Sequence, residues 1–353
     1  MIRCTQCLIP ASRPDTHFEG GVCSACHAYN LRPKIDWEAR KRQLLDLLER
    51  HKGRCIVPSS GGKDSTAQVM MLKELGARPT VVTATTCHLT PMGRHNIDNL
   101  ARHADAIEVT PNRTTRATLN RLGLEMVGDI SWPEHVAIFS IPIRMAARLN
   151  TPLIFYGENP QNQYGGPPGS AEAQIMTARW VSEFGGFNGL RVSDIEVMGY
   201  DMTAYKPPDD WQAAKIEAHF LGQYLPWDSH QNAARAARAG MRYEPPCAAN
   251  WWSWENQDNA QTGIHDFLMF RKFGYGRGCA QISVDIRAGL ISRADAKAWL
   301  KDHDGRYPST YMGIALDDIL EPIGVTSRQF HDIVGMFTNP ELFKDGLLIE
   351  EAA

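Results

Sequence analysis

Short apolar runs rich in β-branched residues alternate with segments of helical spacing along the first part of the chain. The pattern predicts strands at residues 55–58, 80–85, 106–110 and 153–156. Helices are expected between them, at residues 64–75, 92–103, 113–122 and 135–149. Because alternating strands and helices are typical of a parallel sheet covered on both faces, we expect an α/β fold. In such sheets, ligands bind beyond the carboxyl ends of the strands.

The flanking segments have a different character. A linking helix is expected at residues 36–51, and after Asp209 the apolar spacing becomes helical. The helices predicted there cover residues 211–221, 230–239, 258–273, 281–288, 293–301, 316–323 and 327–336. We therefore expect three parts: a small N-terminal module at residues 1–35, the α/β domain at residues 36–208 and a helical domain at residues 209–353.

Composition narrows the class of protein. The 353 residues are 43% hydrophobic and 22% charged, a composition typical of a globular protein. The formal net charge of −3 does not show the positive charge excess typical of nucleic-acid-binding proteins. No apolar stretch is long enough to span a bilayer, and the N-terminus lacks the apolar region of a signal peptide. We therefore expect a cytoplasmic location, where eight cysteines favour metal ligands and free thiols over disulfides.

Four of these cysteines form two C-x-x-C pairs near the N-terminus, Cys4 with Cys7 and Cys23 with Cys26. Four thiolates at this spacing can close a tetrahedron around Zn²⁺ and supply the folding free energy that so short a segment cannot obtain from a hydrophobic core. The spacing predicts a structural zinc ribbon in residues 1–35; an iron–sulfur cluster is an alternative.

A glycine-rich turn follows the first strand and opens the first helix of the α/β part. It consists of Ser60, Gly61, Gly62, Lys63, Asp64, Ser65 and Thr66. The two glycines let the backbone approach a ligand, and a helix N-terminus favours an anion, so this turn is predicted to bind phosphate. It lacks the Walker A spacing. The run resembles the PP-loop of the N-type ATP pyrophosphatases, which split ATP into AMP and pyrophosphate while activating an oxygen of a second substrate.

Other strand ends carry further candidates. Gly157, Glu158 and Asn159 follow the fourth strand and could bind the nucleotide or Mg²⁺, although a loop held by side-chain hydrogen bonds is the alternative. Thr83 lies near the end of the second strand, where the PP-loop resemblance implies a nucleotide contact; a packed strand end is equally compatible with the sequence.

Polar and aromatic residues are dense between residues 246 and 278. Such a mixture suits a pocket for a hydroxylated, anionic ligand, because aromatic rings offer flat faces and arginines offer forked donors. His265, Asp266, Arg271 and Arg277 are the residues that we assign to this substrate pocket. The alternative is that the tryptophans fill an interdomain core and that His265 is a structural histidine.

Together, the cysteine pairs, the glycine-rich turn and the long run at residues 259–287 resemble the N-acetyl sugar amidotransferases of bacterial surface-polysaccharide biosynthesis, the WbpG-like and PseA-like proteins. The resemblance implies an ATP-dependent, Mg²⁺-dependent enzyme of O-antigen assembly. Such an enzyme turns an acetamido group of a nucleotide-linked sugar, here a UDP-linked diacetamido mannuronic acid, into an acetamidino group.

The same resemblance implies roles for individual residues. The turn would hold pyrophosphate, with Lys63 neutralising charge, and Asp64 with Glu158 would hold Mg²⁺. Ammonia would come from a glutaminase and synthase-like pair resembling HisH and HisF, since the other cysteines lack a nucleophile motif. Two alternatives remain at this stage: a tRNA-thiolating PP-loop enzyme, and a non-catalytic scaffold of glycan assembly.

Overall fold

The computed structural model describes residues 1–208, 211 and 214–349. Its main sheet has five parallel strands in the order β5–β4–β3–β6–β7, with bounds Asp105–Val109, Arg78–Ala84, Arg54–Pro58, Leu153–Tyr156 and Glu217–Phe220. Strands β4 and β6 flank β3 on opposite sides, so the chain builds the sheet in one direction through β4 and β5 and in the other through β6 and β7. The strand order therefore reverses at β3. A ligand site is expected at the carboxyl end of this strand.

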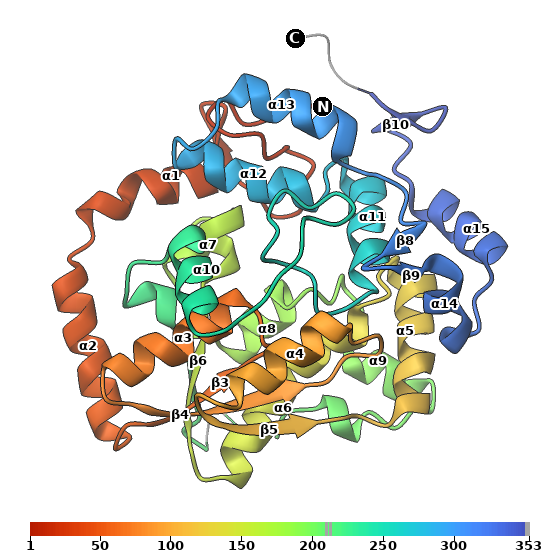
Figure 1. The fold of residues 1–353 in the computed structure, drawn as a ribbon. Helices are drawn as coiled ribbons and strands as arrows, with labels where there is room; N and C mark the ends of the chain where they lie inside the picture. Colours follow the sequence, from red (N-terminus) through yellow and green to blue (C-terminus); the bar gives the residue numbers. More distant parts are fainter. Residues whose placement is uncertain (209–210, 212–213, 350–353) are drawn as a thin grey trace.

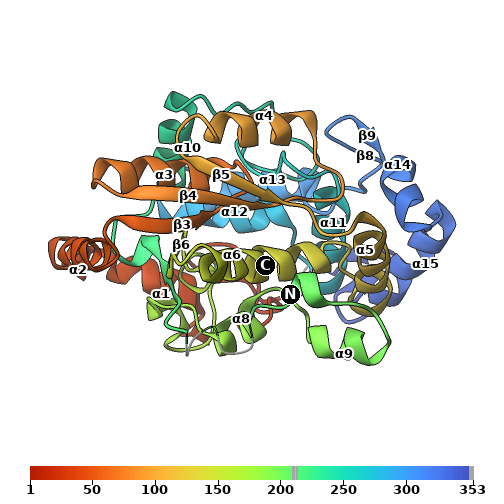
Figure 2. The same ribbon diagram turned by 90° about the horizontal axis from the view of Figure 1, so that it is seen from below.

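Helices cover both faces of the sheet (Figures 1 and 2). The helices of the described residues are α1 Ser24–Leu31, α2 Trp37–Arg50, α3 Lys63–Glu74, α4 Pro91–Leu100, α5 Arg113–Val127, α6 Trp132–Arg148, α7 Pro160–Tyr164, α8 Ala178–Phe184, α9 Val192–Val197, α10 Ser229–Arg238, α11 Thr262–Phe273, α12 Arg277–Arg287, α13 Arg293–His303, α14 Leu316–Leu320 and α15 Ser327–Phe337. Antiparallel pairs outside the main sheet are β1 (Phe18–Glu19) with β2 (Val22–Cys23), β8 (Thr310–Tyr311) with β9 (Ile314–Ala315), and β10 (Phe343–Lys344) with β11 (Leu347–Leu348).

The central strand explains why both faces are covered. Along β3, Ile56 packs into the core beneath α6, whereas Cys55 and Val57 pack into the core shared with α2 and α3. All three side chains are fully buried, as expected for a parallel strand that lies between two helical layers. Figure 2 shows α3 and α4 on one side of the sheet and α6 on the other. The predicted α/β class and its four strands are thus confirmed.

One prediction is wrong: residues 217–220 form strand β7, not part of a helix over residues 211–221. Ala218 and Phe220 enter the core beneath α6, while His219 lies on the other side against Phe155. This period of two matches a strand, and the open edge of β6 supplies the hydrogen-bonding partners that fix it. The rest of that prediction includes residues 212–213, which lie outside the described part of the chain. The sheet therefore continues beyond residue 208.

The C-terminal region is mostly helical, as predicted, and closes over the carboxyl edge of the sheet. Helices α11, α14 and α15 share an apolar core with α5 that includes Leu124, Ile264, Ile319 and Phe330. Helix α11 begins at Thr262, later than the predicted residue 258, because the preceding segment pairs with the loop before α4 through a Leu89–Asn259 bridge. That pairing carries residues 254–259 to the end of β3.

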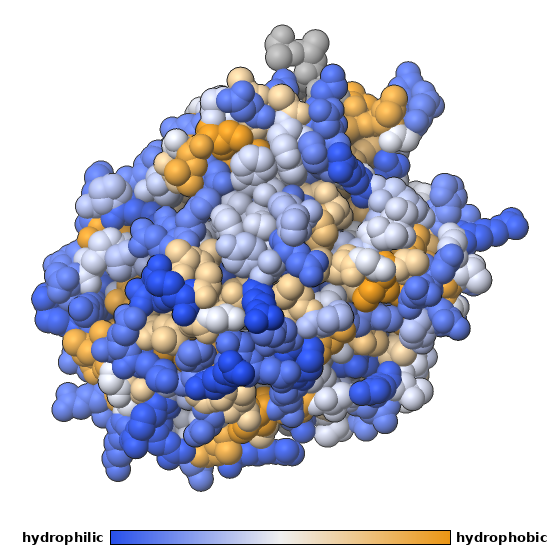
Figure 3. Space-filling view, viewed as in Figure 1, coloured by the Kyte–Doolittle hydropathy of each residue, from blue (hydrophilic) through white to orange (hydrophobic). Residues whose placement is uncertain are grey.

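The face seen in Figure 3 is mostly hydrophilic, and its hydrophobic residues form small separate patches. Among the helices of the described residues, none combines the length and apolar character needed to cross a membrane.

Candidate active site

The turn between β3 and α3 forms an open cradle. Gly61 has φ +81°, and a Cβ atom there would lie 2.6 Å from the backbone nitrogen of Ile97, so only glycine fits. The Ser59 hydroxyl accepts a hydrogen bond from the Gly61 N–H (2.8 Å) and pairs with the Ser65 hydroxyl (2.7 Å). Because Gly62 occupies the N-cap and has no side chain, the first N–H groups of α3 remain available to a ligand.

Beside the cradle, one buried lysine lies between two carboxylates. The Lys63 Nζ atom is 2.5 Å from Asp64 Oδ2 and 2.5 Å from Glu255 Oε1. Burial works against the charged lysine, but both carboxylates raise its pKa well above the ordinary value. Burial likewise works against a charged Glu255, yet Lys63 and a hydrogen bond from Gln281 (2.9 Å) lower the pKa of that carboxyl. Lys63 and Glu255 are therefore charged together.

A third carboxyl group completes this acidic cluster. Burial, together with the neighbouring Asp64 carboxylate, raises the pKa of Glu158 to about 7. Asp64 is held by Asn232, whose Nδ2 donates to Asp64 Oδ1 at 3.1 Å. Carboxylate oxygens are the ligands that Mg²⁺ prefers, and a cation would relieve the repulsion between Asp64 and Glu158 that raises the pKa of Glu158. The donor set therefore fits Mg²⁺.

Cradle and acidic cluster open into one cavity of about 530 Å³ at the carboxyl edge of the sheet. Its walls have three parts. Residues 59–65 and 254–259 form the polar wall around Lys63; an apolar wall is made by Ile138, Phe139, Pro142, Tyr156, Trp180 and Phe220; and a titratable wall is made by Glu134, His135, His265 and Arg277. Such a volume suits a nucleotide together with part of a second substrate.

The titratable wall is held from behind by a buried carboxylate. Asp129 Oδ1 lies 2.8 Å from His265 Nδ1, and Asp129 Oδ2 lies 3.3 Å from His135 Nδ1. Burial alone would raise the pKa of Asp129, but the two imidazoles hold it well below its ordinary value. Burial raises the pKa of Glu134 to about 7, and its Oε1 atom has no hydrogen-bond partner among the described residues.

Most of the residues assigned from the sequence meet at this cavity. Those that line it are Ser60, Gly61, Gly62, Lys63, Asp64, Ser65, Gly157, Glu158, His265 and Arg277. Asp266 lies behind the wall and orients Arg277, whose Nη2 donates to Asp266 Oδ1 at 2.8 Å. Sequence reasoning thus located both the cradle and one wall of the site.

Four assigned residues lie elsewhere. Arg271 donates to the Thr338 hydroxyl and the Gly346 carbonyl and covers the ring of Phe343, so it ties the C-terminal hairpin down instead of facing the cavity. Asn159 caps α7 and donates to the carbonyl groups of Ser170 and Ala173. Thr83 and Thr66 are buried away from the cavity. For these residues the packed, structural alternatives describe what is seen.

Four residues of the site were not singled out from the sequence: Glu255, Glu134, His135 and the carboxylate Asp129. Glu255 stands in the aromatic and polar run that the sequence marked, but nothing local distinguishes it from its neighbours. Asp129 and Glu134 flank the start of α6, where acidic residues are ordinary helix-start signals. The contact of Asp129 with His265 spans 136 positions, so no local sign of it is visible in the sequence.

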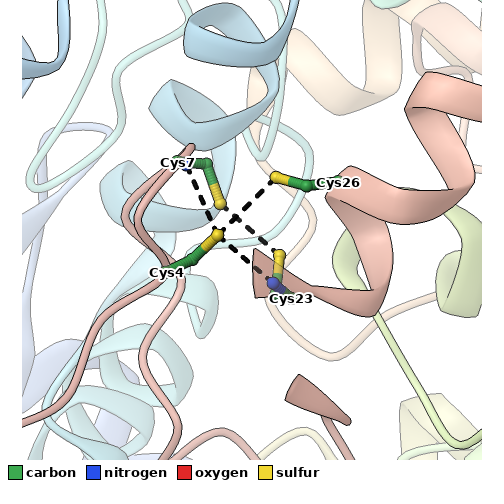
Figure 4. Close-up of side chains that lie close together, drawn as sticks. All are labelled: Cys4, Cys7, Cys23 and Cys26. Carbon is green, nitrogen blue, oxygen red and sulfur yellow. Dashed lines mark hydrogen bonds between the residues drawn. The ribbon is translucent and has the colours of Figure 1, made fainter. Parts of the chain in front are cut away.

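The four N-terminal cysteines form a compact cluster (Figure 4). The Sγ atoms of Cys4 and Cys26 are 3.8 Å apart, and those of Cys7 and Cys23 are 3.6 Å apart. Tetrahedral zinc with Zn–S bonds of about 2.3 Å requires sulfur atoms about 3.8 Å apart. All four side chains are fully buried, and the Cys23 N–H donates to Cys4 Sγ at 3.3 Å. The cluster fits a structural zinc ion.

The cysteine module is fixed to the helical region and to the active-site loop. From α13, Arg293 donates to the backbone carbonyls of Cys7 (3.1 Å) and Cys4 (3.2 Å). From α1, the Ser24 hydroxyl accepts a hydrogen bond from the Gly166 N–H at 3.0 Å. Because Gly166 follows α7, which ends at the cavity residue Tyr164, the module helps to hold that side of the site.

Comparison with known proteins gives one family. Residues 242–350 match the C-terminal domain of the WbpG-like LPS biosynthesis proteins. The search of curated proteins gave no match. Among solved structures, the chain is similar to NMN synthetase from Francisella tularensis, with 10% identity over 60% of this chain and 99% of that chain and a TM-score of 0.28. Residues 242–350 are therefore similar to the C-terminal domain of the WbpG-like LPS biosynthesis proteins, in agreement with the family resemblance seen in the sequence.

Proposed function

We propose that this protein is an ATP-dependent, AMP-forming amidotransferase that converts an acetamido group of a nucleotide-linked sugar into an acetamidino group. The observation that carries the proposal is the uncapped start of α3, which opens beside Lys63 into a cavity with room for a nucleotide and part of a second substrate. The match to the WbpG-like domain supports LPS biosynthesis as the setting. The sugar that we propose is a UDP-linked 2,3-diacetamido-2,3-dideoxy-mannuronic acid.

The chemistry requires activation because an amide oxygen is a poor leaving group. Transfer of AMP to that oxygen forms a new P–O bond and releases pyrophosphate; ammonia then forms a C–N bond, and AMP departs with the former amide oxygen. The protein must stabilise the departing pyrophosphate, align the amide with the α-phosphate and exclude water from the activated intermediate. Different walls of the cavity are suited to binding the pyrophosphate, the nucleobase and the sugar.

In this proposal the cradle binds the pyrophosphate. The N–H groups at Gly62 and the first turn of α3 are available to its oxygens, and Lys63 adds a positive charge. Asp64 and Glu158 would hold Mg²⁺, which offsets phosphate charge when it is bound. The apolar wall suits the flat face of a nucleobase, and Arg277, steadied by Asp266, suits the carboxylate of a uronic acid.

Ammonia is the second nucleophile that the reaction needs. We propose that a glutaminase and synthase-like pair resembling HisH and HisF supplies it, and that ammonium salts replace this pair in vitro.

The test is a product assay with ATP, Mg²⁺, ammonium chloride and the UDP-linked sugar, followed by mass spectrometry. Replacement of one acetamido oxygen by NH lowers the sugar mass by about one dalton, and AMP must accumulate in equal amount. Formation of ADP in place of AMP would overturn the mechanism. An unchanged sugar, together with AMP formed only when tRNA is added, would favour the thiolation alternative.

A further inference from the structure

Asp129 is a buried carboxylate whose two oxygens are both fully occupied. Oδ1 accepts the Ser131 N–H (2.9 Å) and faces His265 Nδ1 (2.8 Å), while Oδ2 accepts from Asn188 Nδ2 (3.1 Å) and faces His135 Nδ1 (3.3 Å). The side chain is only 1% exposed. A carboxylate with this many donors is rigid, and it dictates how both imidazole rings are oriented.

The contacts fix the tautomer of each ring. A charged carboxylate accepts hydrogen bonds, so each Nδ1 atom that faces Asp129 must carry a hydrogen. The Nδ1 of His135 also faces the Gly186 carbonyl at 3.3 Å, which requires the same hydrogen. Each neutral imidazole therefore has its lone pair on Nε2, at the ring edge directed away from Asp129. Both histidines line the cavity and keep a fifth to a quarter of their surface exposed.

His265 is the better placed of the two to exchange a proton. It makes the shorter contact with Asp129, and its Nε2 atom is 4.0 Å from Asp266 Oδ1. Asp266 is itself paired with Arg277, which moderates its charge. The rings of His135 and His265 pack edge to face, with centroids 5.1 Å apart. This contact restricts the orientation of the His265 ring in addition to the hydrogen bond to Asp129.

We propose that His265 is the base that takes a proton from the attacking ammonia, and that Asp129 and His135 are the residues that position it. This assignment rests on the proposed amidotransferase function. When ammonia adds to the carbon of the adenylated amide, the new C–N bond leaves a positive charge on nitrogen. One proton passes from that nitrogen to His265 Nε2, after which the C–O bond to AMP breaks and the acetamidino group remains.

The same three donors lie within 4.8 Å of one another, a spacing that could also hold a metal ion. A metal on the Nδ1 atoms would replace the hydrogens that now bridge to Asp129 and Gly186. The His135 contact of 3.3 Å equals the ligand spacing of about 3.3 Å around tetrahedral zinc with bonds of about 2.0 Å, but the His265 contact of 2.8 Å is shorter than that spacing and is a normal length for a charge-assisted hydrogen bond. The geometry therefore favours proton transfer.

The experiment separates adenylation from ammonia transfer. Sugar-dependent exchange of labelled pyrophosphate into ATP reports the first step, and mass spectrometry of the sugar with ammonium chloride reports the second. Three proteins are compared: the unaltered chain, the His265→Gln variant and a control His303→Gln variant, whose histidine stacks on Trp299 outside the cavity. Asp129→Asn is measured in parallel.

We expect His265→Gln to retain pyrophosphate exchange within about twofold and to lose acetamidino formation by about 10²–10⁴-fold, the contribution of general base catalysis. Imidazole added to the buffer should restore part of the loss. Asp129→Asn should lower the same step, because His265 then loses its fixed tautomer, and His303→Gln should change neither step. Retained exchange also shows that each variant is folded.

Three results would overturn the assignment. Equal losses of exchange and transfer in His265→Gln would make the residue part of substrate binding. Unchanged transfer would remove it from the reaction. A metal equivalent beyond that of the cysteine cluster, lost in His265→Gln, would make the triad a metal site. If instead the unaltered protein forms no acetamidino sugar, the proposed function fails, and the role of His265 falls with it.

Discussion

The buried lysine of the cradle allows the sharpest prediction. The Lys63 side chain is 3% exposed and balances two carboxylates, of which Glu255 is 16% and Asp64 is 27% exposed. Lys63→Met keeps the length and apolar stem of the side chain but leaves both carboxylates without their cation. Breaking a buried ion pair in this way costs about 3–5 kcal/mol, because the remaining charge stays buried without compensation.

The lower end of this range is expected here, since the partial exposure of Asp64 allows it to regain water. A loss of about 3 kcal/mol corresponds to a fall in Tm of about 4 °C for a chain of this size. In the double variant Lys63→Met/Glu255→Gln, the more buried carboxylate is also neutralised, so most of this loss should be recovered. Both variants should fail to form AMP, because the positive charge beside the pyrophosphate is gone in each.

The pH dependence follows from the sign of the shift. Lys63 lowers the pKa of Glu255 in the folded protein, so this pair stabilises the fold above the ordinary Glu value of 4.5 and the effect is lost as the pH falls. The gap in Tm between the unaltered chain and Lys63→Met should therefore be widest above about pH 5 and should narrow below it. Thermal unfolding followed by circular dichroism measures this gap. A difference in unfolding free energy of less than about 1 kcal/mol between the unaltered chain and Lys63→Met, with no recovery of stability in the double variant, would refute the reasoning.

Three further predictions concern other parts of the protein. Metal analysis should give about one zinc per chain, and Cys26→Ser should lose zinc and lower Tm, whereas Cys87→Ser should do neither; a zinc-free protein that melts normally would contradict the cluster. Because burial and Asp64 raise the pKa of Glu158 to about 7, the fold should lose stability as the pH rises from about 4.5 to about 8 in the absence of Mg²⁺. In Glu158→Gln this loss should be smaller; equal pH profiles for the two proteins would show that the carboxyl ionises normally. Arg271→Ala should lower Tm by loosening the C-terminal hairpin while leaving KM for the sugar unchanged, and a raised KM would return Arg271 to the substrate site.

Local chemistry was enough to predict the parts of the site that are contiguous in sequence. The strand, glycine turn and helix around Gly61 depend on backbone rules and short-range periodicity, so they appear in the structure where the sequence indicated them. The two C-x-x-C motifs, Cys4 with Cys7 and Cys23 with Cys26, are likewise visible in the spacing alone. The structure brings the two motifs together within one short N-terminal segment, with Cys4 beside Cys26 and Cys7 beside Cys23.

Tertiary structure decided the remainder. Strand β7 forms because the edge of β6 offers hydrogen-bonding partners, although its own sequence reads as helical. Lys63 meets Glu255, and Asp129 meets His265 across 136 positions, only because the C-terminal segment folds back over the carboxyl edge of the sheet. Arg271 was assigned to the pocket by composition, yet its place on α11 directs it to the hairpin. Residue types and spacing determined which chemistry this protein could have; which charges are brought together and desolvated depends on chain topology, since ionic contacts between distant segments leave no local pattern in a sequence.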